Sequence, residues 1–191
     1  MARNDDRRIL LADAGVAVLA RDGARGLTHR AVDREAKVPL GTASNYFTTR
    51  DLLIRALVSR IEQRLTPAPE TLARLGVREP SRELFAEYLR DIVRRLSAEP
   101  EVTLALFELR LEAGRRPEVG KVMGEWLRAG FDGDVAFNSA AGLPGGRGAI
   151  ALFHYAIDGL MLDRLTLSID PETSTDDVIE ALVAGLLPSN A

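Results

Sequence analysis

Apolar residues along this chain recur three and four positions apart, which is the spacing of one face of an α-helix. Between Arg7 and Asp22 that face consists of Leu11, Ala14, Gly15, Val18 and Leu19. The same period continues over residues 49–65, 81–97, 101–114, 117–137, 150–167 and 176–187. Together with two shorter helices near the N-terminus, the pattern predicts an all-α chain of about nine helices.

Glycine and proline mark the expected boundaries between these helices. Gly23 supplies the positive φ that often follows a helix C-terminus. Residues 66–80 contain three prolines and one glycine, so we expect the main domain boundary there. The expected domains are residues 1–50, joined by a bridging helix at 51–65 to a helical body at 66–191.

A glycine-rich run, Gly142–Gly148, lies within residues 138–148. No strand pattern precedes this run and no Gly-Lys-Ser/Thr follows it, which argues against a phosphate-binding loop. We therefore expect a flexible surface connection there. The helix before it is expected to loosen near Gly130 and Gly133.

Two short helices separated by a tight turn are predicted near the N-terminus. Thr28 can cap the first helix, which carries Val32 and Ala36 on one face. Pro39 disfavours helix at the residue before it and can occupy the first position of the second helix, expected over residues 40–46. This arrangement is the outline of a helix-turn-helix, which predicts a three-helix DNA-binding head in front of a helical bundle.

The distribution of charge agrees with that division. The whole chain has a formal net charge of -3, but residues 1–66 hold 12 Lys/Arg against 8 Asp/Glu, a net +4. Residues 67–191 hold 13 against 20, a net -7. A basic head attracts DNA phosphates, whereas an acidic body stays away from them, so the sequence favours double-stranded DNA as the partner of the head.

Composition excludes several other classes of protein. Cysteine is absent and histidine occurs twice, so disulfides, thiolate catalysis and cysteine- or histidine-rich metal sites are not expected. No apolar run approaches roughly 18 residues and the N-terminus lacks an apolar signal core, so we expect a cytoplasmic protein that makes no membrane contact.

An enzyme is the competing functional class. Its candidate acid–base groups are His154, Asp158 and Asp163, but no nucleophile lies at a recognised motif spacing from them. We therefore predict no enzymatic activity, no catalytic residues, no metal and no cofactor.

The predicted helix-turn-helix has a distinctive order of residues. The run Thr28, Ala36-x-Val38-x-x-Gly41-Thr42-x-x-x-x-Phe47-x-x-Arg50-x-x-Leu53 resembles the N-terminal signature of TetR-family transcriptional regulators, densely so over residues 11–56. Lys37 stands where that family usually has Gly, Asp33 where it usually has Ala, and residues 43–46 replace its usual Leu-Tyr-Tyr-His. The resemblance implies a repressor that a small-molecule inducer releases from DNA.

Two groups of side chains in the head are candidates for DNA contact. Hydroxyl and guanidinium groups near helix N-termini suit phosphates, and these are Thr28, Arg30, Tyr46 and Arg50. The residues expected to face the major groove are Pro39, Leu40, Thr42, Ser44 and Asn45. There an Asn amide can pair with adenine and apolar groups can touch the thymine methyl.

Polar and aromatic side chains on expected inward faces of the body suggest a pocket for an unknown small-molecule effector. They are Phe107, Arg110, Trp126, His154, Tyr155 and Asp158. His154 and Asp158 are four residues apart, so they can bind a ligand together or satisfy each other. A plain packed core is the alternative.

The helix over residues 150–167 is more apolar than packing on one face requires. With the helix over residues 176–187 it is expected to form a four-helix homodimer interface, which would place two DNA-reading helices on a roughly palindromic operator. A helical protein-interaction module that uses these helices on a foreign partner, without a DNA role, is the alternative function.

Overall fold

The computed structural model describes residues 2–188, with side chains from Asn4 onward, and this part of the chain forms ten helices and no strand. The prediction of an all-α chain is confirmed. The helices are α1 (Ala2–Gly26), α2 (His29–Glu35), α3 (Thr42–Tyr46), α4 (Arg50–Leu65), α5 (Pro69–Gly76), α6 (Arg82–Ala98), α7 (Pro100–Ala113), α8 (Pro117–Ala140), α9 (Arg147–Leu165) and α10 (Thr175–Leu186). None of them is both long and apolar enough to cross a bilayer within the described residues.

Hydroxyl side chains cap the starts of α2 and α4. The hydroxyl of Thr28 accepts a hydrogen bond from the N–H of Ala31 at 3.1 Å, and that of Thr49 accepts one from Leu52 at 3.2 Å. Gly23 has a φ of 67°, which interrupts α1 one turn before its end. The hydroxyls of Thr28 and Thr49 thus satisfy first-turn N–H groups of α2 and α4.

Several helix boundaries differ from the prediction. The tenth helix, α5, lies within the expected boundary region, and Pro69 lies at its start, where a missing N–H costs nothing. The α8 helix continues past Gly130 and Gly133 instead of loosening, because a glycine lowers helix propensity by about 1 kcal/mol without forbidding the conformation. The glycine-rich connection is only 141–146, since α9 begins at Arg147.

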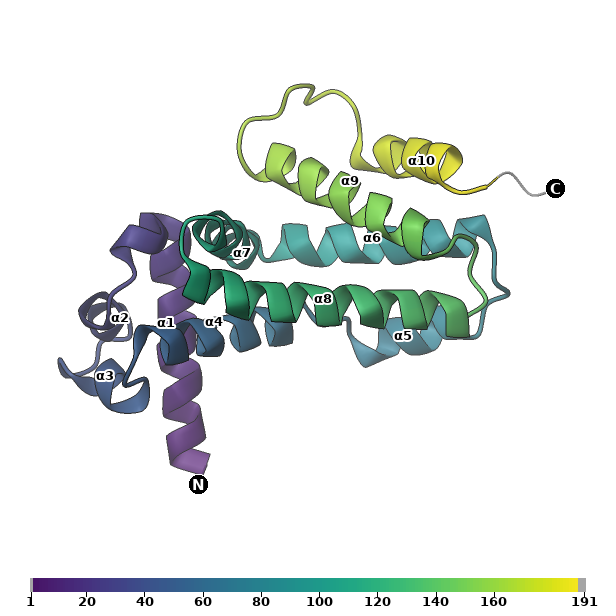
Figure 1. Cartoon of the computed structure of the whole chain (residues 1–191). Coiled ribbons are helices and arrows are strands. Elements are labelled where there is room, and N and C mark those ends of the chain that lie inside the picture. The colour runs from purple at the N-terminus through teal and green to yellow at the C-terminus, as the bar shows by residue number, and fades with distance from the viewer. Residues whose placement is uncertain (1, 189–191) are drawn as a thin grey trace. The chain divides into compact units, whose positions relative to one another are not determined.

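The helices form two compact units. The first unit comprises the chain up to Thr66 together with Glu99–Trp126, and therefore contains α1 to α4, α7 and the start of α8. The second comprises Pro67–Ala98 and the chain from Leu127, and contains α5, α6, the rest of α8, α9 and α10 (Figure 1).

The first unit is built around α1, which packs against α2, α4 and α7. Its α1–α4 contact is close because Gly15 has no side chain; a Cβ atom there would lie 2.7 Å from a methyl carbon of Leu57. Asp13 of α1 accepts hydrogen bonds from Arg60 of α4 at 2.8 and 3.1 Å. Its fully buried large side chains are Leu11, Leu19, Leu27, Phe47, Leu53, Ile54, Leu57, Ile61, Leu109 and Met123.

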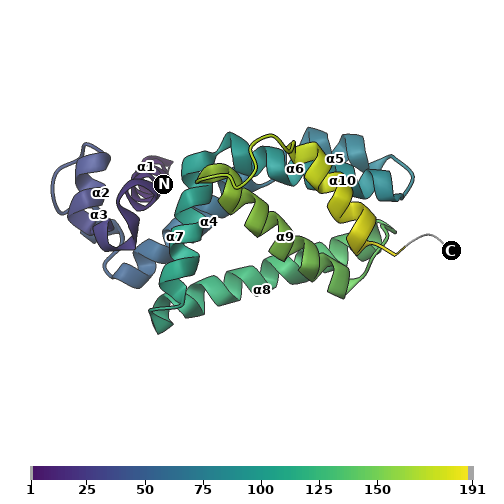
Figure 2. The ribbon, with the colours of Figure 1, turned by 90° about the horizontal axis from the view of Figure 1, so that it is seen from above.

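The second unit joins α6, α9 and α10, which lie side by side in Figure 2. The rings of Phe85 and Phe153 join α6 to α9, with centroids 4.7 Å apart. Arg82 of α6 donates hydrogen bonds to the carbonyls of Val183 and Ala184 at 2.7 and 3.1 Å. A cation at this end of α10 interacts favourably with the negative end of the helix dipole, and it adds a donor to Val183, whose carbonyl also accepts the N–H of Leu187 at 3.3 Å.

The connection between α2 and α3 is a Schellman turn. The N–H of Val38 donates to the carbonyl of Asp33 at 3.0 Å, and that of Lys37 donates to the carbonyl of Arg34 at 3.1 Å. The turn requires a positive φ at the position of Lys37, where φ is 53°. A Cβ atom crowds the following carbonyl in that conformation, so Lys37 is strained where glycine would not be.

We predict that Lys37→Gly raises the free energy of unfolding by about 0.5–1 kcal/mol, because relief of the left-handed strain exceeds the extra flexibility that glycine brings to the unfolded chain. Thermal and urea denaturation followed by circular dichroism measure the change. Lys37→Ala removes the same charge but keeps the Cβ atom, so it is the matched control and should give no increase. Equal stabilisation by both substitutions would contradict the strain at this turn.

Candidate nucleic-acid interface

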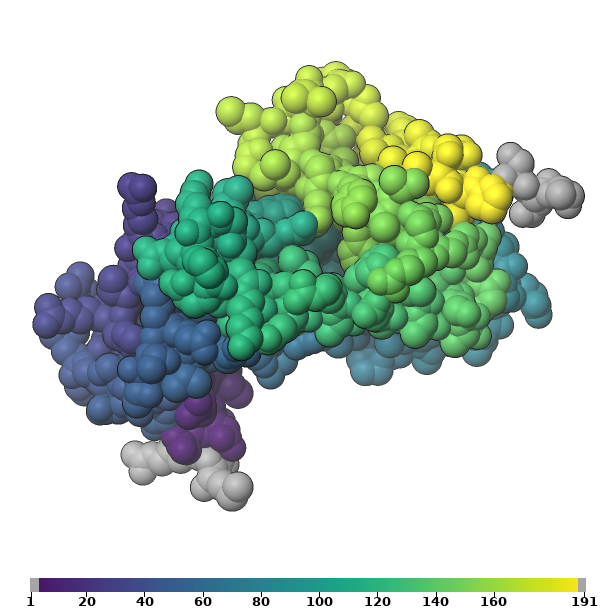
Figure 3. All heavy atoms as spheres, viewed as in Figure 1, coloured from purple at the N-terminus to yellow at the C-terminus, as the bar shows by residue number. Residues whose placement is uncertain are grey.

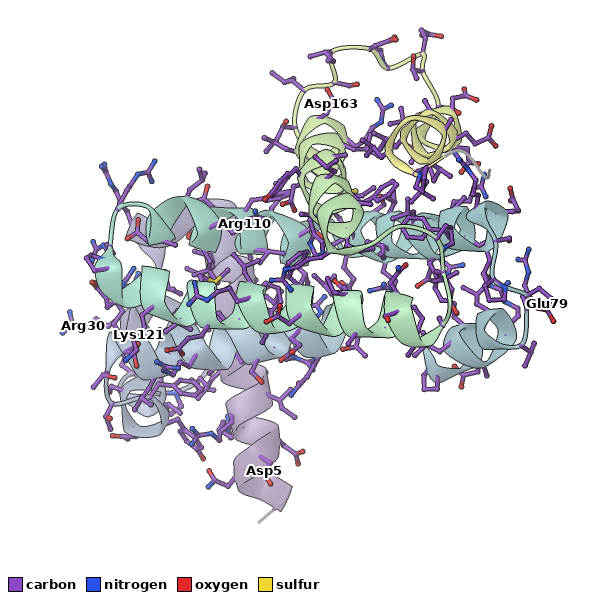
Figure 4. All side chains as sticks on the ribbon, turned by 45° about the vertical axis from the view of Figure 1, so that its right-hand side comes forward. Asp5, Arg30, Glu79, Arg110, Lys121 and Asp163 are labelled. Atoms are coloured by element: carbon purple, nitrogen blue, oxygen red, sulfur yellow. The ribbon has the colours of Figure 1, made fainter. Side chains whose placement is uncertain are left out.

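The start of α2 presents an exposed hydroxyl and an exposed cation. Thr28 and Arg30 are both exposed, and the Arg30 side chain extends away from the helix (Figure 4). Arg34 and Lys37 are exposed further along α2 and just after it. Because Asp33 on the same helix is buried, the outer surface of this segment is rich in cations, which is the charge that DNA phosphates attract.

The helix α3 is held by a side chain from α2. Asp33 is fully buried, and its two carboxylate oxygens accept hydrogen bonds from the N–H of Gly41 at 2.7 Å and from the N–H of Ala43 at 2.6 Å. The N-cap residue Gly41 has a φ of 93° and no side chain with which to cap the helix itself. Asp33 therefore satisfies first-turn donors that α3 cannot satisfy locally.

The structure corrects the start of this helix. The α3 helix begins at Thr42 instead of residue 40, so Pro39 does not occupy its first position and lies in the turn with Leu40. The reason is that Gly41 takes the left-handed conformation, which ends the turn and allows the helix to begin one residue later. Both Pro39 and Leu40 are nevertheless exposed, Leu40 by 68%.

One face of α3 is buried and the other is open. Ala43 and the following Phe47 are buried in the first unit, whereas Ser44 and Asn45 are exposed. Of the remaining candidates, Thr42 and Tyr46 are half-buried. The residues expected to face a DNA groove therefore lie together on the outer side of the turn and helix.

Two of the hydroxyl groups on this surface already donate hydrogen bonds to backbone carbonyls just before the helix. The hydroxyl of Thr42 donates to the carbonyl of Pro39 at 2.5 Å, and that of Ser44 donates to the carbonyl of Gly41 at 2.9 Å. Their lone pairs remain available as acceptors. Asn45 makes no side-chain hydrogen bond to another described residue, so its amide presents both donors and acceptor outward.

Arg50, a predicted phosphate contact, is bonded within the fold. Its guanidinium donates to the carbonyl of Leu27 at 2.7 Å and to that of Ala24 at 2.8 Å, and its Nε atom is buried. It therefore joins the start of α4 to the end of α1 instead of standing free for a phosphate. His29 has a similar joining role, since its Nε2–H donates to the carbonyl of Phe47 at 2.6 Å.

The candidate effector residues fall in both compact units. Phe107, Arg110 and Trp126 belong to the first unit, and His154, Tyr155 and Asp158 to the second. Neither unit by itself brings all six together. Tyr155 is 69% exposed, and His154 pairs with Asp134 of α8 at 3.0 Å instead of with Asp158.

Two open grooves stand out on the first unit. The larger, of about 360 Å³, lies between α1 and α4 and is lined by Ile9, Leu52 and Arg55, among others. The smaller, of about 210 Å³, lies between α4 and the start of α8, where Glu62, Glu125 and Trp126 line it. Trp126 is thus the one predicted effector residue that lines either groove. Among the described residues, no three His, Asp or Glu side chains form a group that would hold a metal ion.

The second unit exposes an apolar stripe along α9. Its exposed residues follow spacings of four and three, and they are Gly148, Leu152, Tyr155, Gly159 and Leu162. The neighbouring α10 exposes small residues, Ala181, Ala184 and Gly185. Figure 3 shows the atoms of α9, α10 and their connection at the surface of this unit. This is the surplus apolar surface that the sequence predicts for these two helices.

Sequence reasoning missed the residues that position α3. Asp33 and His29 both lie on α2, and neither was a candidate because a buried carboxylate and a ring–carbonyl bond have no local sequence pattern. The one signal was that Asp33 interrupts the apolar face of α2 next to Val32, where a charge requires a buried partner.

Comparison with known proteins gives matches to a family and to a curated relative. Residues 80–189 match the family described as Tetracyclin repressor-like, C-terminal domain. The chain is 29% identical over 116 residues to the HTH-type nicotine-responsive transcriptional repressor HdnoR of Paenarthrobacter nicotinovorans, a match that covers 60% of this chain and 58% of that repressor. The chain thus spans little more than half the length of that relative.

Solved structures resemble the chain over nearly its full length. The multidrug binding protein EbrR complexed with imidazole is 28% identical, covers 97% of both chains and has a TM-score of 0.68. A TetR-family member from Streptomyces coelicolor A3 is 29% identical, covers 96% of this chain and 99% of its own, and also has a TM-score of 0.68. The match of the family over more than half of the sequence, with the fold and the helix-turn-helix described above, shows that this chain belongs to the TetR family of regulators.

Proposed function

We propose that the chain is a sequence-specific DNA-binding transcriptional regulator, a repressor that a small molecule releases from a palindromic operator. In this proposal residues 1–50 bind DNA, the helix over residues 51–65 bridges, and residues 66–191 bind the effector and dimerise. The observation that carries the proposal is the outer face of α3, where Asn45 and Ser44 are exposed while Ala43 is anchored in the core. Family membership supports a regulator over an enzyme.

The exposed residues of the head suit two kinds of DNA contact. Thr28 and Arg30 at the start of α2, together with Tyr46, are proposed to hold phosphates, which sets position without reading sequence. Pro39, Leu40, Thr42, Ser44 and Asn45 are proposed to face the major groove. Arg50 is proposed to act through the fold, since its guanidinium is already bonded to two carbonyls.

Dimerisation is proposed to occur through α9 and α10. The exposed stripe on α9 contains a glycine between two large residues, so Gly159 permits a second helix to approach closely between Tyr155 and Leu162. A two-fold dimer would present two copies of α3 to successive major grooves about 34–36 Å apart. The same apolar surface would also serve the alternative function, in which these helices bind a foreign partner. Membership of the TetR family favours a second copy of this chain instead.

The effector is proposed to be a small nitrogen heterocycle that carries a positive charge. The relatives support this class, since EbrR has been solved with imidazole, proflavin and ethidium, and HdnoR is nicotine-responsive. On this chain the groove with Trp126 offers an aromatic ring and the carboxylate of Glu62, while its second carboxylate, Glu125, is paired with Arg55 at 3.5 Å. The ring and the Glu62 carboxylate suit such a cation. The other candidates, Phe107, Arg110, His154, Tyr155 and Asp158, remain proposed contacts of the same effector.

We predict that Asn45→Ala changes which operator is preferred, whereas Arg30→Ala weakens binding to all duplexes about equally and lowers the salt slope by about one. Fluorescence anisotropy over a series of salt concentrations measures both, on the duplex that the wild-type chain selects from a randomised pool and on single-base variants of it. Identical behaviour of the two variants would overturn the division between base reading and phosphate contact.

We predict that Leu162→Glu converts the dimer to a monomer, because a carboxylate on the α9 stripe cannot be buried against its symmetry copy. Operator affinity should then fall roughly a hundredfold, since two linked heads bind more tightly than one. Sedimentation velocity measures the assembly. Leu111→Glu on α7 is the matched control, because Leu111 is 56% exposed and Leu162 is 50% exposed. A dimeric Leu162→Glu variant would exclude α9 from the interface.

We predict that nicotine or proflavin raises the unfolding temperature of the wild-type chain. At a free ligand concentration a hundred times the dissociation constant, the folded state should gain about 2.7 kcal/mol. Differential scanning calorimetry measures the shift. The sole tryptophan is Trp126, so its fluorescence should change on binding, and Trp126→Ala should abolish the response. The control Phe137→Ala alters a partly exposed ring on the same helix, outside this groove, and should respond as wild type. Equal stabilisation of wild type and Trp126→Ala would exclude this groove.

A further inference from the structure

We propose that Asp33 is the positioning residue that fixes α3 in the orientation needed for operator recognition. The role rests on the proposed function in DNA binding and concerns a residue that touches no DNA itself. The observations that carry it are the complete burial of Asp33 and its two hydrogen bonds, one to Gly41 N–H at 2.7 Å and one to Ala43 N–H at 2.6 Å.

The α3 helix depends on such an anchor because it is very short. It has five residues, and a single helical turn has too few internal hydrogen bonds to be stable alone. Its first N–H groups bond outside the helix: Gly41 and Ala43 to Asp33, and Thr42 to the carbonyl of Pro39 at 3.1 Å. At the other end, His29 bonds to the carbonyl of Phe47. Both long-range anchors come from α2, so α2 determines how α3 is oriented.

The same residue also shapes the turn that leads to α3. The backbone carbonyl of Asp33 accepts the N–H of Val38 in the Schellman turn, while its side chain bonds beyond the turn to Gly41 and Ala43. Asp33 thus contacts both ends of the connection between the two helices. A change in its side chain should alter the orientation of α3 without altering the hydrophobic core.

The charge of Asp33 distinguishes a positioning role from a merely structural one. The carboxylate lies at the positive end of the α3 dipole and occupies donors that would otherwise be open to an anion. Near DNA its negative charge opposes phosphate binding of any sequence. Removing the charge should therefore favour nonspecific binding, and only the loss of a correctly oriented α3 should weaken specific binding.

The test is Asp33→Asn, which has nearly the same shape but places an amide N–H₂ where one of the backbone donors needs an acceptor. On the duplex that wild type selects from a randomised pool, we expect the affinity of the variant to fall roughly ten- to a hundredfold. On a scrambled duplex of equal length, we expect unchanged or higher affinity. A fold that is merely destabilised would lose affinity for both duplexes in the same proportion.

The matched control is Glu35→Gln, which removes one negative charge from the same helix. Glu35 is ion-paired with Arg21 at 2.8 Å and has no bond to α3, so its variant should keep the ratio of specific to nonspecific affinity. Hydrogen exchange on the wild-type protein gives a second measurement that needs no variant. The N–H groups of Gly41 and Ala43 should exchange slowly in the free protein.

The outcomes separate this role from the proposed function. If wild type selects no duplex, the proposed function fails and the role of Asp33 fails with it. If wild type selects a duplex and Asp33→Asn binds it with wild-type affinity, or loses both affinities equally, only the role of Asp33 is overturned. Rapid hydrogen exchange at the N–H groups of Gly41 and Ala43 in the wild-type protein would also overturn the role of Asp33. This measurement decides the question even if Asp33→Asn does not fold.

Discussion

A helix of one turn cannot hold its own orientation, and the first unit meets this constraint with hydrogen bonds that originate outside α3. The carboxylate of Asp33 binds two N–H groups at the start of the helix, and His29 binds the carbonyl just after its end. Phe47 adds a buried side chain beneath it. These contacts leave one whole face of α3 open, and an open face on a fixed helix is what a base-reading surface requires.

The helix-turn-helix is also part of a larger packed unit. The α7 helix packs along α1, although it falls within the segment that matches the C-terminal family domain. Asp13 of α1 binds Arg60 and Arg64 of α4, and Arg64 also pairs with Glu99, just before α7. The α7 helix therefore contacts α1, which is the helix that α2 packs against. Both grooves on this unit border α4, which shares that core.

Local chemistry made the helices and their ends predictable from the sequence. Apolar spacing located seven of the ten helices, and capping and turn residues located α2 and α3, with Thr28 as the cap of α2. These signals depend on residues close together in the sequence. Contacts between distant residues were not predictable in this way. Arg50, a predicted phosphate contact, bonds to carbonyls 23 and 26 residues earlier, and His154, a predicted effector contact, pairs with Asp134 on another helix.

The central claim is that two copies of the α3 surface bind one duplex together. Hydroxyl-radical footprinting of the wild-type protein on its selected duplex tests this most directly. The account predicts two protected segments related by a two-fold axis, with centres one helical turn, about 34–36 Å, or a multiple of it apart. A single protected segment, or uniform protection along any duplex, would contradict it.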